Sequence, residues 1–323
     1  MKNMMILVKK SVKCSLGVLL ATVAWSCESE LTQSPAYRVD VSFPKLPANQ
    51  PMGQASGVAV NSKGEVWVYH REERPFLVFD AKGNFLRAIG TDKKKGAHGL
   101  RFDTDDNLWI TDYLNHTVKK LDQTGTVLLS LGQEGIAGDD SAHFNQPTDV
   151  AFAANGDFYI SDGYGNARVV QYNRQGKFIR QWGTHGSSPG QFNLPHAVQV
   201  DSKGNVYVAD RENFRIQVFT SNGQFIRQLT GYSPYGMFVT KDDLLFVVDG
   251  KANRLYKMTL TGEQLASWGG GPGDDITKEL GKNFVLRLKQ GAFSMPHAIS
   301  VGPDGAVYVA EINGQRVQKF MPE

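Results

Sequence analysis

Apolar and polar residues alternate along short stretches through most of the chain. The clearest stretches come in pairs, each pair joined by a polar turn such as Ser-Lys-Gly or Pro-Asp-Gly. Alternation with a period of two on both sides of a glycine turn is typical of a β-hairpin. The sequence predicts such hairpins at residues 54–70, 96–112, 146–162, 194–210, 233–249 and 295–311.

Each hairpin is the first half of a longer repeat. In most copies a third alternating segment follows, as in residues 167–172 (ARVVQY) and 214–219 (FRIQVF), and then an outer strand. Four strands in each of six copies predict an all-β, six-bladed β-propeller, whose radial repetition leaves only short sheet edges exposed. The last copy stops at Phe320 without an outer strand, whereas residues 37–43 alternate like a strand. We therefore expect an N-terminal strand to complete the sixth blade and close the ring.

The first 26 residues differ from the repeat region. They begin with four lysines and continue with an apolar run over residues 15–24, which is too short to span a bilayer. This order is typical of an export signal. Residues 24–27 (AWSC) resemble the bacterial lipobox, in which the cysteine carries a lipid and becomes the new N-terminus. We expect a lipoprotein-type signal peptide over 1–26, a polar tether over 27–36 and the propeller over 37–323.

The same segment predicts where the protein acts. A lipid on Cys27 would be its membrane anchor, holding the exported chain so that it faces the periplasm or the cell exterior. Because Trp25 is unusual in a lipobox, secretion without a lipid is the alternative. Cys14 lies inside the signal, and the chain contains 2 cysteines in all. The mature protein therefore has no disulfide and no cysteine to bind a metal or act as a nucleophile.

Composition narrows the classes of partner. The chain has 323 residues, of which 41% are hydrophobic and 21% charged, as expected of a globular protein. Its formal net charge of +3 depends on the signal, because removing those four lysines leaves 31 basic and 32 acidic residues. A net charge of −1 argues against a nucleic-acid partner. We expect a monomer that acts on a small molecule.

Histidines recur at one equivalent position of the repeat. The first residue of the innermost strand of each blade lines the axis of a propeller, and in the second, fourth and sixth blades this residue is His98, His196 and His297. In a sixfold ring these side chains lie about 120° apart and point to one centre. Three imidazoles and one free position are typical of a catalytic zinc site. A channel lined by polar residues and filled with water is the alternative. We expect His70, His116, His143 and His185 to be ordinary surface or loop residues.

A second equivalent position lies 14 residues later and ends the next strand. It carries an acid in five of the six blades, Asp112, Asp162, Asp210, Asp249 and Glu311. So regular a feature indicates a structural role, bonding turn amides or the arginine of nearby Asn-x-Arg segments. The residues that follow vary between blades, and Arg71, Tyr113, Tyr164 and Arg211 stand out. Arginine suits binding of a substrate carboxylate, and tyrosine suits proton transfer.

Several of these motifs resemble one known family. The segments SGVAV with VWVYHR, QPTDVAF with ISDGYGNARVVQY, PHAVQV and VADRENFRIQVF are similar to the lyase domain of peptidylglycine α-amidating enzymes. That domain is a six-bladed propeller of NHL-type repeats, and the resemblance runs from Gly53 to Phe320. It implies cleavage of a peptidyl- or N-acyl-α-hydroxyglycine into an amide and glyoxylate, with a small peptide or an N-acylglycine derivative as substrate.

The resemblance also assigns roles to residues. It implies that zinc binds to His98, His196 and His297. It also implies catalytic roles for Arg71, Tyr164 and Arg211. Zinc would bind the substrate hydroxyl as a Lewis acid. Tyr164, made more acidic by the metal and by Arg211, would take the hydroxyl proton, and Arg71 would hold the carboxylate or stabilise developing charge. Ala298 stands where the family often has an aspartate that serves a structural calcium ion, which argues against calcium at that position.

Three other readings stay open at this point. A non-enzymatic NHL propeller could bind a protein or glycan partner at the cell surface, although a docking scaffold has no need of three convergent imidazoles. A lactonase-type hydrolase would normally carry acids and asparagines on the axis for calcium, where this chain has histidines. An RNA-binding propeller would need a basic face, and the charge of the mature chain gives no sign of one.

Overall fold

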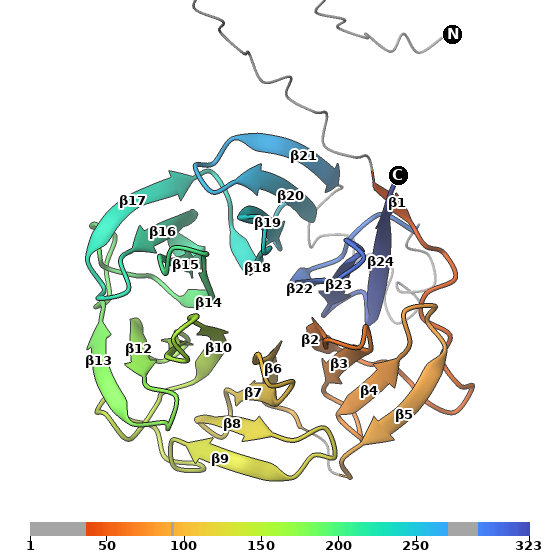
Figure 1. Ribbon diagram of the computed structural model, residues 1–323, viewed down its shortest axis with the longest axis horizontal. Helices are drawn as coiled ribbons and strands as arrows, with labels where there is room; N and C mark the ends of the chain where they lie inside the picture. Colours follow the sequence, from red (N-terminus) through yellow and green to blue (C-terminus); the bar gives the residue numbers. More distant parts are fainter. Residues whose placement is uncertain (1–36, 92–93, 271–289) are drawn as a thin grey trace, which may run out of the picture. The chain divides into compact units, whose positions relative to one another are not determined.

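The computed structural model describes residues 37–91, 94–270 and 290–323. Over these ranges the chain forms six four-stranded antiparallel sheets arranged around a common axis (Figure 1). The predicted six-bladed propeller is thereby confirmed. The predicted signal peptide and tether lie outside the described residues. Among those residues the one helix is the 3-10 turn η1 (Arg211–Asn213), and no helix is long and apolar enough to cross a membrane.

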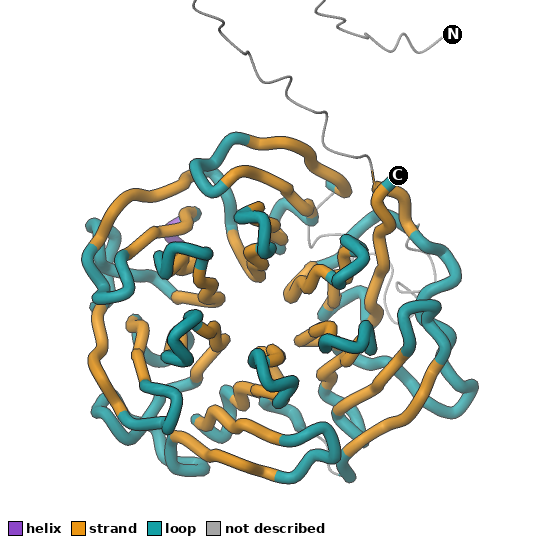
Figure 2. The backbone as a smooth tube through the Cα atoms, viewed as in Figure 1, coloured by secondary structure: helices purple, strands orange, loops and turns teal. Residues whose placement is uncertain are grey.

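The strands follow the repeat order read from the sequence, with the innermost strand first. Strands joined by loops make up each blade (Figure 2). Blades 1 to 3 consist of β2 (Ala55–Val60), β3 (Val66–His70), β4 (Phe76–Phe79) and β5 (Phe85–Ile89); β6 (Ala97–Phe102), β7 (Leu108–Asp112), β8 (Thr117–Leu121) and β9 (Val127–Leu131); and β10 (Pro147–Phe152), β11 (Phe158–Asp162), β12 (Arg168–Tyr172) and β13 (Phe178–Trp182). Blades 4 to 6 consist of β14 (Pro195–Val200), β15 (Val206–Asp210), β16 (Arg215–Phe219) and β17 (Phe225–Thr230); β18 (Pro234–Val239), β19 (Leu244–Asp249), β20 (Arg254–Thr259) and β21 (Gln264–Gly269); and β22 (Pro296–Val301), β23 (Val307–Glu311), β24 (Arg316–Pro322) and β1 (Tyr37–Val39).

The turn between β14 and β15 shows why the hairpins form where the sequence predicts them. Gly204 has a φ of +81°, a left-handed conformation that costs glycine little, and its N–H donates to the carbonyl of Asp201 at 3.0 Å. The Asp201 carboxylate accepts from the N–H of Lys203 at 3.0 Å and from that of Asn205 at 2.8 Å. Local side-chain acceptors of this kind fix the turn and with it the register of the two strands.

The ring is closed by the N-terminal strand, as predicted. Strand β1 pairs with β24 as the outer strand of blade 6, with Tyr37 opposite Pro322 and Val39 opposite Phe320. The strand is shorter than the predicted 37–43, because the chain leaves the sheet after Val39. Phe43 instead packs between blades, 5.3 Å from the ring of Tyr308 and 5.9 Å from that of Phe79.

The hydrophobic core lies between neighbouring blades. One buried cluster joins Trp67 and Tyr69 of blade 1 to Leu100, Leu108 and Ile110 of blade 2, and similar clusters join the other blades. The innermost two strands of each blade are almost fully buried, whereas outer strands such as β9 and β13 are partly exposed. Packing therefore fixes the axial strands most firmly, and these are the strands that carry the histidines.

The repeated acids have the structural role predicted for them. In blades 3, 4 and 6 the acid forms an ion pair with an arginine of the same blade. The pairs are Asp162 with Arg168 at 2.9 Å, Asp210 with Arg215 at 2.7 Å, and Glu311 with Arg316 at 2.7 Å. The same carboxylates accept backbone N–H groups just before the axial strand, at 2.9 Å from Asn145, 2.6 Å from Asn193 and 2.6 Å from Ser294. Each acid thus holds the loop that leads into the axial strand of its own blade.

Candidate metal centre

The three axial histidines are aimed inward by an irregularity of the strands that carry them. Each is the second residue of its strand, His98 in β6, His196 in β14 and His297 in β22, and these strands alternate around the axis with β2, β10 and β18 (Figure 1). Pairing with the next strand shifts register across each histidine, for example between Pro195 and Ala197. Such a shift leaves one residue out of the ladder and turns its side chain away from the sheet.

The imidazoles meet on the axis. Their candidate ligand atoms all lie within 4.8 Å of one another, and the Nε2 atoms of His98 and His196 are 3.2 Å apart. Nitrogens that share one tetrahedral zinc at about 2.05 Å would be about 3.3 Å apart. The rings are at most 4% exposed. The spacing is therefore close to that of a coordinated set, and the side chains are shielded from bulk water.

Hydrogen bonds from the neighbouring blades fix the tautomer of each ring. In each ring Nδ1 contacts a backbone carbonyl oxygen of the next blade. The distances are 2.7 Å from His98 to Thr148, 2.5 Å from His196 to Tyr235, and 2.7 Å from His297 to Ser56. A carbonyl oxygen only accepts, so Nδ1 carries the proton and Nε2 presents a lone pair. The 3.2 Å contact between two Nε2 atoms is then a repulsion that a shared cation relieves.

The protonation state favours a metal as well. Burial is the main cause that lowers the pKa of His98 and of His196 well below the ordinary value, and it lowers the pKa of His297 to about 3. The guanidinium group of Arg211 lowers all three pKa values further, and that of Arg71 lowers the pKa values of His98 and His297. Neutral imidazole is the form that binds metal ions. The donor set therefore fits a transition metal ion held by three nitrogens, with one position left for a substrate or water.

Tyr164 occupies the side of the triad that the histidines leave open. It follows β11, and its hydroxyl oxygen lies 3.1 Å from Nε2 of His98 and 3.0 Å from Nε2 of His196. Burial raises the pKa of this hydroxyl, while the positive charge of Arg211 acts against the rise. Without a metal the loss of hydration thus outweighs the effect of the guanidinium group, and the expectation of a tyrosine made more acidic by the metal and Arg211 together stays a prediction.

The two predicted arginines lie beside this cluster. Arg71 donates from Nε to the carbonyl of Ala97 at 3.3 Å and from Nη1 to Gln54 at 3.1 Å. Arg211 packs its guanidinium group over the ring of Tyr235 at 4.5 Å and over that of Tyr164 at 5.5 Å. Two fixed cations next to three neutral imidazoles give the site a positive field, which attracts an anionic group such as a carboxylate.

Comparison with known proteins agrees with the repeat and the site. The NHL repeat model matches residues 144–172, 192–219 and 293–320, in blades 3, 4 and 6. Peptidyl-glycine alpha-amidating monooxygenase A of Xenopus laevis is 34% identical over 91% of this chain, which spans about a third (34%) of that protein's length. A probable peptidyl-alpha-hydroxyglycine alpha-amidating lyase of Caenorhabditis elegans is 29% identical over 83% of each chain. Human NHL repeat-containing protein 3 is 33% identical, over 93% of this chain and 87% of its own.

This chain belongs to the family of NHL-repeat proteins that includes human NHL repeat-containing protein 3, and it is similar to peptidyl-α-hydroxyglycine α-amidating lyases. Solved structures agree on the fold. A streptogramin B lyase matches with a TM-score of 0.60 at 16% identity, covering 89% of this chain and 98% of its own. A gluconolactonase from Xanthomonas campestris matches with a TM-score of 0.61 at 10% identity, covering 84% and 86%. Similarity at such low identity concerns the architecture of this NHL-repeat protein and not its chemistry.

Four more residues lie around the candidate site, of which Tyr113 was noticed in the sequence without a place in the predicted site and the other three were missed. The ring of Tyr113 lies 5.9 Å from that of His98 and under the guanidinium group of Arg71 at 5.4 Å. The carbonyl of Tyr235 holds His196, while its ring supports Arg211. Glu212 accepts from Nε of Arg211 at 2.9 Å and so orients it. The carbonyl of Thr148 gave no sequence signal, because any residue offers one.

The other histidines lie apart from the metal centre, although one prediction about them was wrong. His70 was expected at the surface but is fully buried at the end of β3, where Nε2 lies 3.0 Å from the carbonyl of Arg74. It replaces the acid found in the other blades and holds its own loop. Nδ1 of His143 lies 2.9 Å from Asp140, and Nδ1 of His116 accepts from the N–H of Gln146 at 3.1 Å.

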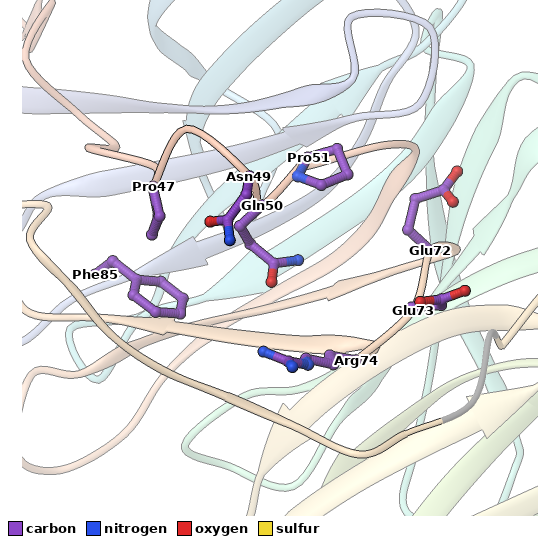
Figure 3. A pocket seen from close by; sticks show the side chains of 8 residues that line it. All are labelled: Pro47, Asn49, Gln50, Pro51, Glu72, Glu73, Arg74 and Phe85. Atoms are coloured by element: carbon purple, nitrogen blue, oxygen red, sulfur yellow. The ribbon is translucent and has the colours of Figure 1, made fainter.

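A surface pocket of about 310 Å³ lies beside blade 1 and is separate from the metal centre (Figure 3). It is formed where the segment that includes Pro47, Asn49 and Gln50 faces Phe85 and the loop at 72–74. None of the six predicted site residues lines it. By contrast, the histidines share a cavity of about 20 Å³ with the axial strands, which is enough for one ion or one water molecule.

Proposed function

We propose that this protein is a zinc-dependent carbon–nitrogen lyase that cleaves peptidyl- or N-acyl-α-hydroxyglycines to an amide and glyoxylate. One observation carries the proposal. Three Nε2 lone pairs converge on the axis, and the hydroxyl of Tyr164 lies within 3.1 Å of two of them, at the position where a substrate hydroxyl would meet both a metal and a base. The name of the relative in Caenorhabditis elegans supports the same reaction, and that of the relative in Xenopus laevis also refers to α-amidation.

The metal would be held by His98, His196 and His297, and as a Lewis acid it would lower the pKa of the substrate hydroxyl. Tyr164 is placed to accept the proton of that hydroxyl. The electron pair of the O–H bond then forms the aldehyde carbonyl of glyoxylate, and the C–N bond breaks with its electrons on nitrogen. Tyr164 returns the proton to the leaving amide nitrogen, so the reaction needs no other reactant.

The arginines would bind and orient the substrate. Arg71, fixed by Ala97 and Gln54, would take the carboxylate of the hydroxyglycine in charge-assisted hydrogen bonds. Arg211 is held by Glu212 against the rings of Tyr164 and Tyr235, where it would stabilise the phenolate form of Tyr164 that takes the proton. Both guanidinium groups are positioned before substrate arrives, which reduces the reorganisation needed in the transition state.

The deciding experiment is release of glyoxylate from a peptide that ends in α-hydroxyglycine. The purified protein should produce glyoxylate and peptide amide in equal amounts, stop after treatment with a chelator and recover when zinc is added back. A metal-free protein with full turnover would refute the mechanism. A protein with neither metal nor turnover would instead favour a docking propeller. Human NHL repeat-containing protein 3, a relative whose name states no reaction, keeps that alternative in view.

We also propose that the protein is exported and anchored through a lipid on Cys27. The basic start, the apolar run and the lipobox-like residues 24–27 support this. Radiolabelled palmitate should be incorporated into the wild-type protein and not into Cys27→Ala. If both proteins stay unlabelled while both are exported, the protein is secreted without a lipid.

A further inference from the structure

Two residues break the regularity of the axial strands just beyond the histidine layer. The residue after the axial position is glycine or alanine in five blades, namely Gly57, Gly99, Ala197, Gly236 and Ala298, but it is Asp149 in blade 3. Two positions further along, the residues are Ala59, Ala151, Gln199, Phe238 and Ser300, but Arg101 in blade 2. The small residues are required by close approach, since a Cβ on Gly236 would lie 2.7 Å from the carbonyl oxygen of His297. At these two positions the sequence therefore has one acidic residue, Asp149, and one basic residue, Arg101.

Arg101 and Asp149 bind each other between the neighbouring axial strands β6 and β10. Nε of Arg101 donates to Oδ1 of Asp149 at 3.0 Å and Nη2 donates to Oδ2 at 2.7 Å, which is a bidentate pair. The guanidinium group also donates to the carbonyls of Ile299 at 3.2 Å and Met237 at 3.0 Å, and Asp149 accepts from the N–H of Val198 at 3.4 Å. These bonds connect the axial strands of blades 2, 3, 4, 5 and 6.

The same bonds reach the segments that hold the histidines. Asp149 comes directly after Thr148, whose carbonyl accepts from His98. Met237 comes two residues after Tyr235, whose carbonyl accepts from His196. Ile299 lies two residues after His297 on the same strand. Arg101 and Asp149 line the small cavity that the three histidines line, and Arg101 also lines a cavity of about 250 Å³ at the far ends of the axial strands. The arginine therefore separates the metal centre from that end of the channel.

Stability alone gives a weak reason for such a pair. The side chains are only 12% and 5% exposed, and the desolvation of two buried charges offsets much of their attraction. What the pair adds is geometry, because a planar guanidinium group accepts few arrangements of a carboxylate and two carbonyls. We propose that the Arg101–Asp149 pair is a positioning element of the metal centre, which holds the axial strands at the spacing that lets the three Nε2 atoms share one cation. This inference rests on the proposed metal centre.

The test removes both charges together, so that no single buried charge is left to unfold the protein. Arg101→Met with Asp149→Asn should fold, bind zinc about 10- to 100-fold more weakly in competition with a chromophoric chelator, and change the visible absorption bands of the cobalt-substituted protein. The matched control is Arg87→Met with Glu65→Gln, which removes another bidentate pair, at 2.8 Å and 2.9 Å, from the outer part of blade 1. It should leave zinc affinity and the cobalt spectrum unchanged.

Arg101→Lys covers the case in which the double variant does not fold. It keeps the charge, but an ammonium group cannot make the bidentate contact and reach both carbonyls, so zinc affinity should still fall. The inference is overturned if a folded variant binds zinc and cobalt as the wild type does, or if the wild type binds neither metal. A wild type that binds zinc but releases no glyoxylate would sink the proposed reaction and leave the positioning role standing.

Discussion

The hydroxyl oxygen of Tyr164 lies 3.0 Å from Nε2 of His196, although the two residues belong to different blades. Both ends of this contact are fixed, the imidazole by the carbonyl of Tyr235 and the phenol by its packing against Arg211. A proton-transferring group is therefore held beside the place where the proposed metal binds. The contact separates two functions that substitution can test one at a time.

Replacing Tyr164 by phenylalanine should remove proton transfer and keep metal binding. The ring stays in place against Arg211, but no oxygen remains to accept the substrate proton. We expect kcat to fall about 10²-fold or more, as is typical for the loss of a positioned acid–base group. Zinc content measured by atomic emission should equal that of the wild type. Unchanged turnover would show that another group takes the proton.

Replacing His196 by alanine should remove the metal and the activity together while the fold survives. Two imidazoles bind zinc much more weakly than three, whereas the apolar clusters between blades do not include this side chain. The melting temperature of the wild type should rise with added zinc because the ion binds the folded state, and that of His196→Ala should not. His143→Ala, at a histidine outside the centre, is the control and should behave as the wild type.

Replacing Arg71 by methionine should weaken binding of the substrate carboxylate. Losing a charged hydrogen-bonding partner costs about 1.5–3 kcal/mol, so kcat/KM should fall about 10- to 150-fold. The effect should nearly vanish with a substrate whose carboxylate is replaced by a carboxamide. An equal loss with both substrates would mean that Arg71 acts on the reacting atoms rather than on the carboxylate.

Replacing Tyr37 by alanine should destabilise the closed ring. Tyr37 lies in β1 and packs edge-on against Trp268 at 4.8 Å and Phe246 at 6.3 Å, so it joins blade 6 to blade 5. Loss of this half-buried ring should lower the free energy of unfolding by about 2 kcal/mol in a urea titration. Val41→Ala is the control in the same segment, since Val41 is 70% exposed and should change stability little.

The fold could be predicted from the sequence because each repeat is specified by residues close together in the chain. Each hairpin carries its own alternation and its own glycine turn, as at Gly204, and the packing between blades repeats the same contacts. The place of His98, His196 and His297 followed from the same register, because one position of the repeat always faces the axis. Because the ring is symmetric, residues at the same position of alternate repeats could be predicted to lie close together.

Features that break the repeat could not be predicted in this way. Arg101 and Asp149 differ from the residues at the same positions of the other blades, and only the width of the channel decides that a guanidinium group from blade 2 reaches carbonyls of blades 5 and 6. The raised pKa of Tyr164 likewise depends on burial by side chains distant in sequence. His70 was misjudged because it fills a slot that acids fill elsewhere.

The pairing of β1 with β24 has a consequence for biosynthesis. The first described strand has no partner in its own blade until residues 316–322 have been made, so a nascent chain holds an open arc of blades and cannot seal itself. The ring therefore cannot close before β24 has been synthesised. For the export proposed above, a chain whose propeller is not yet closed is easier to unfold and translocate than a closed propeller.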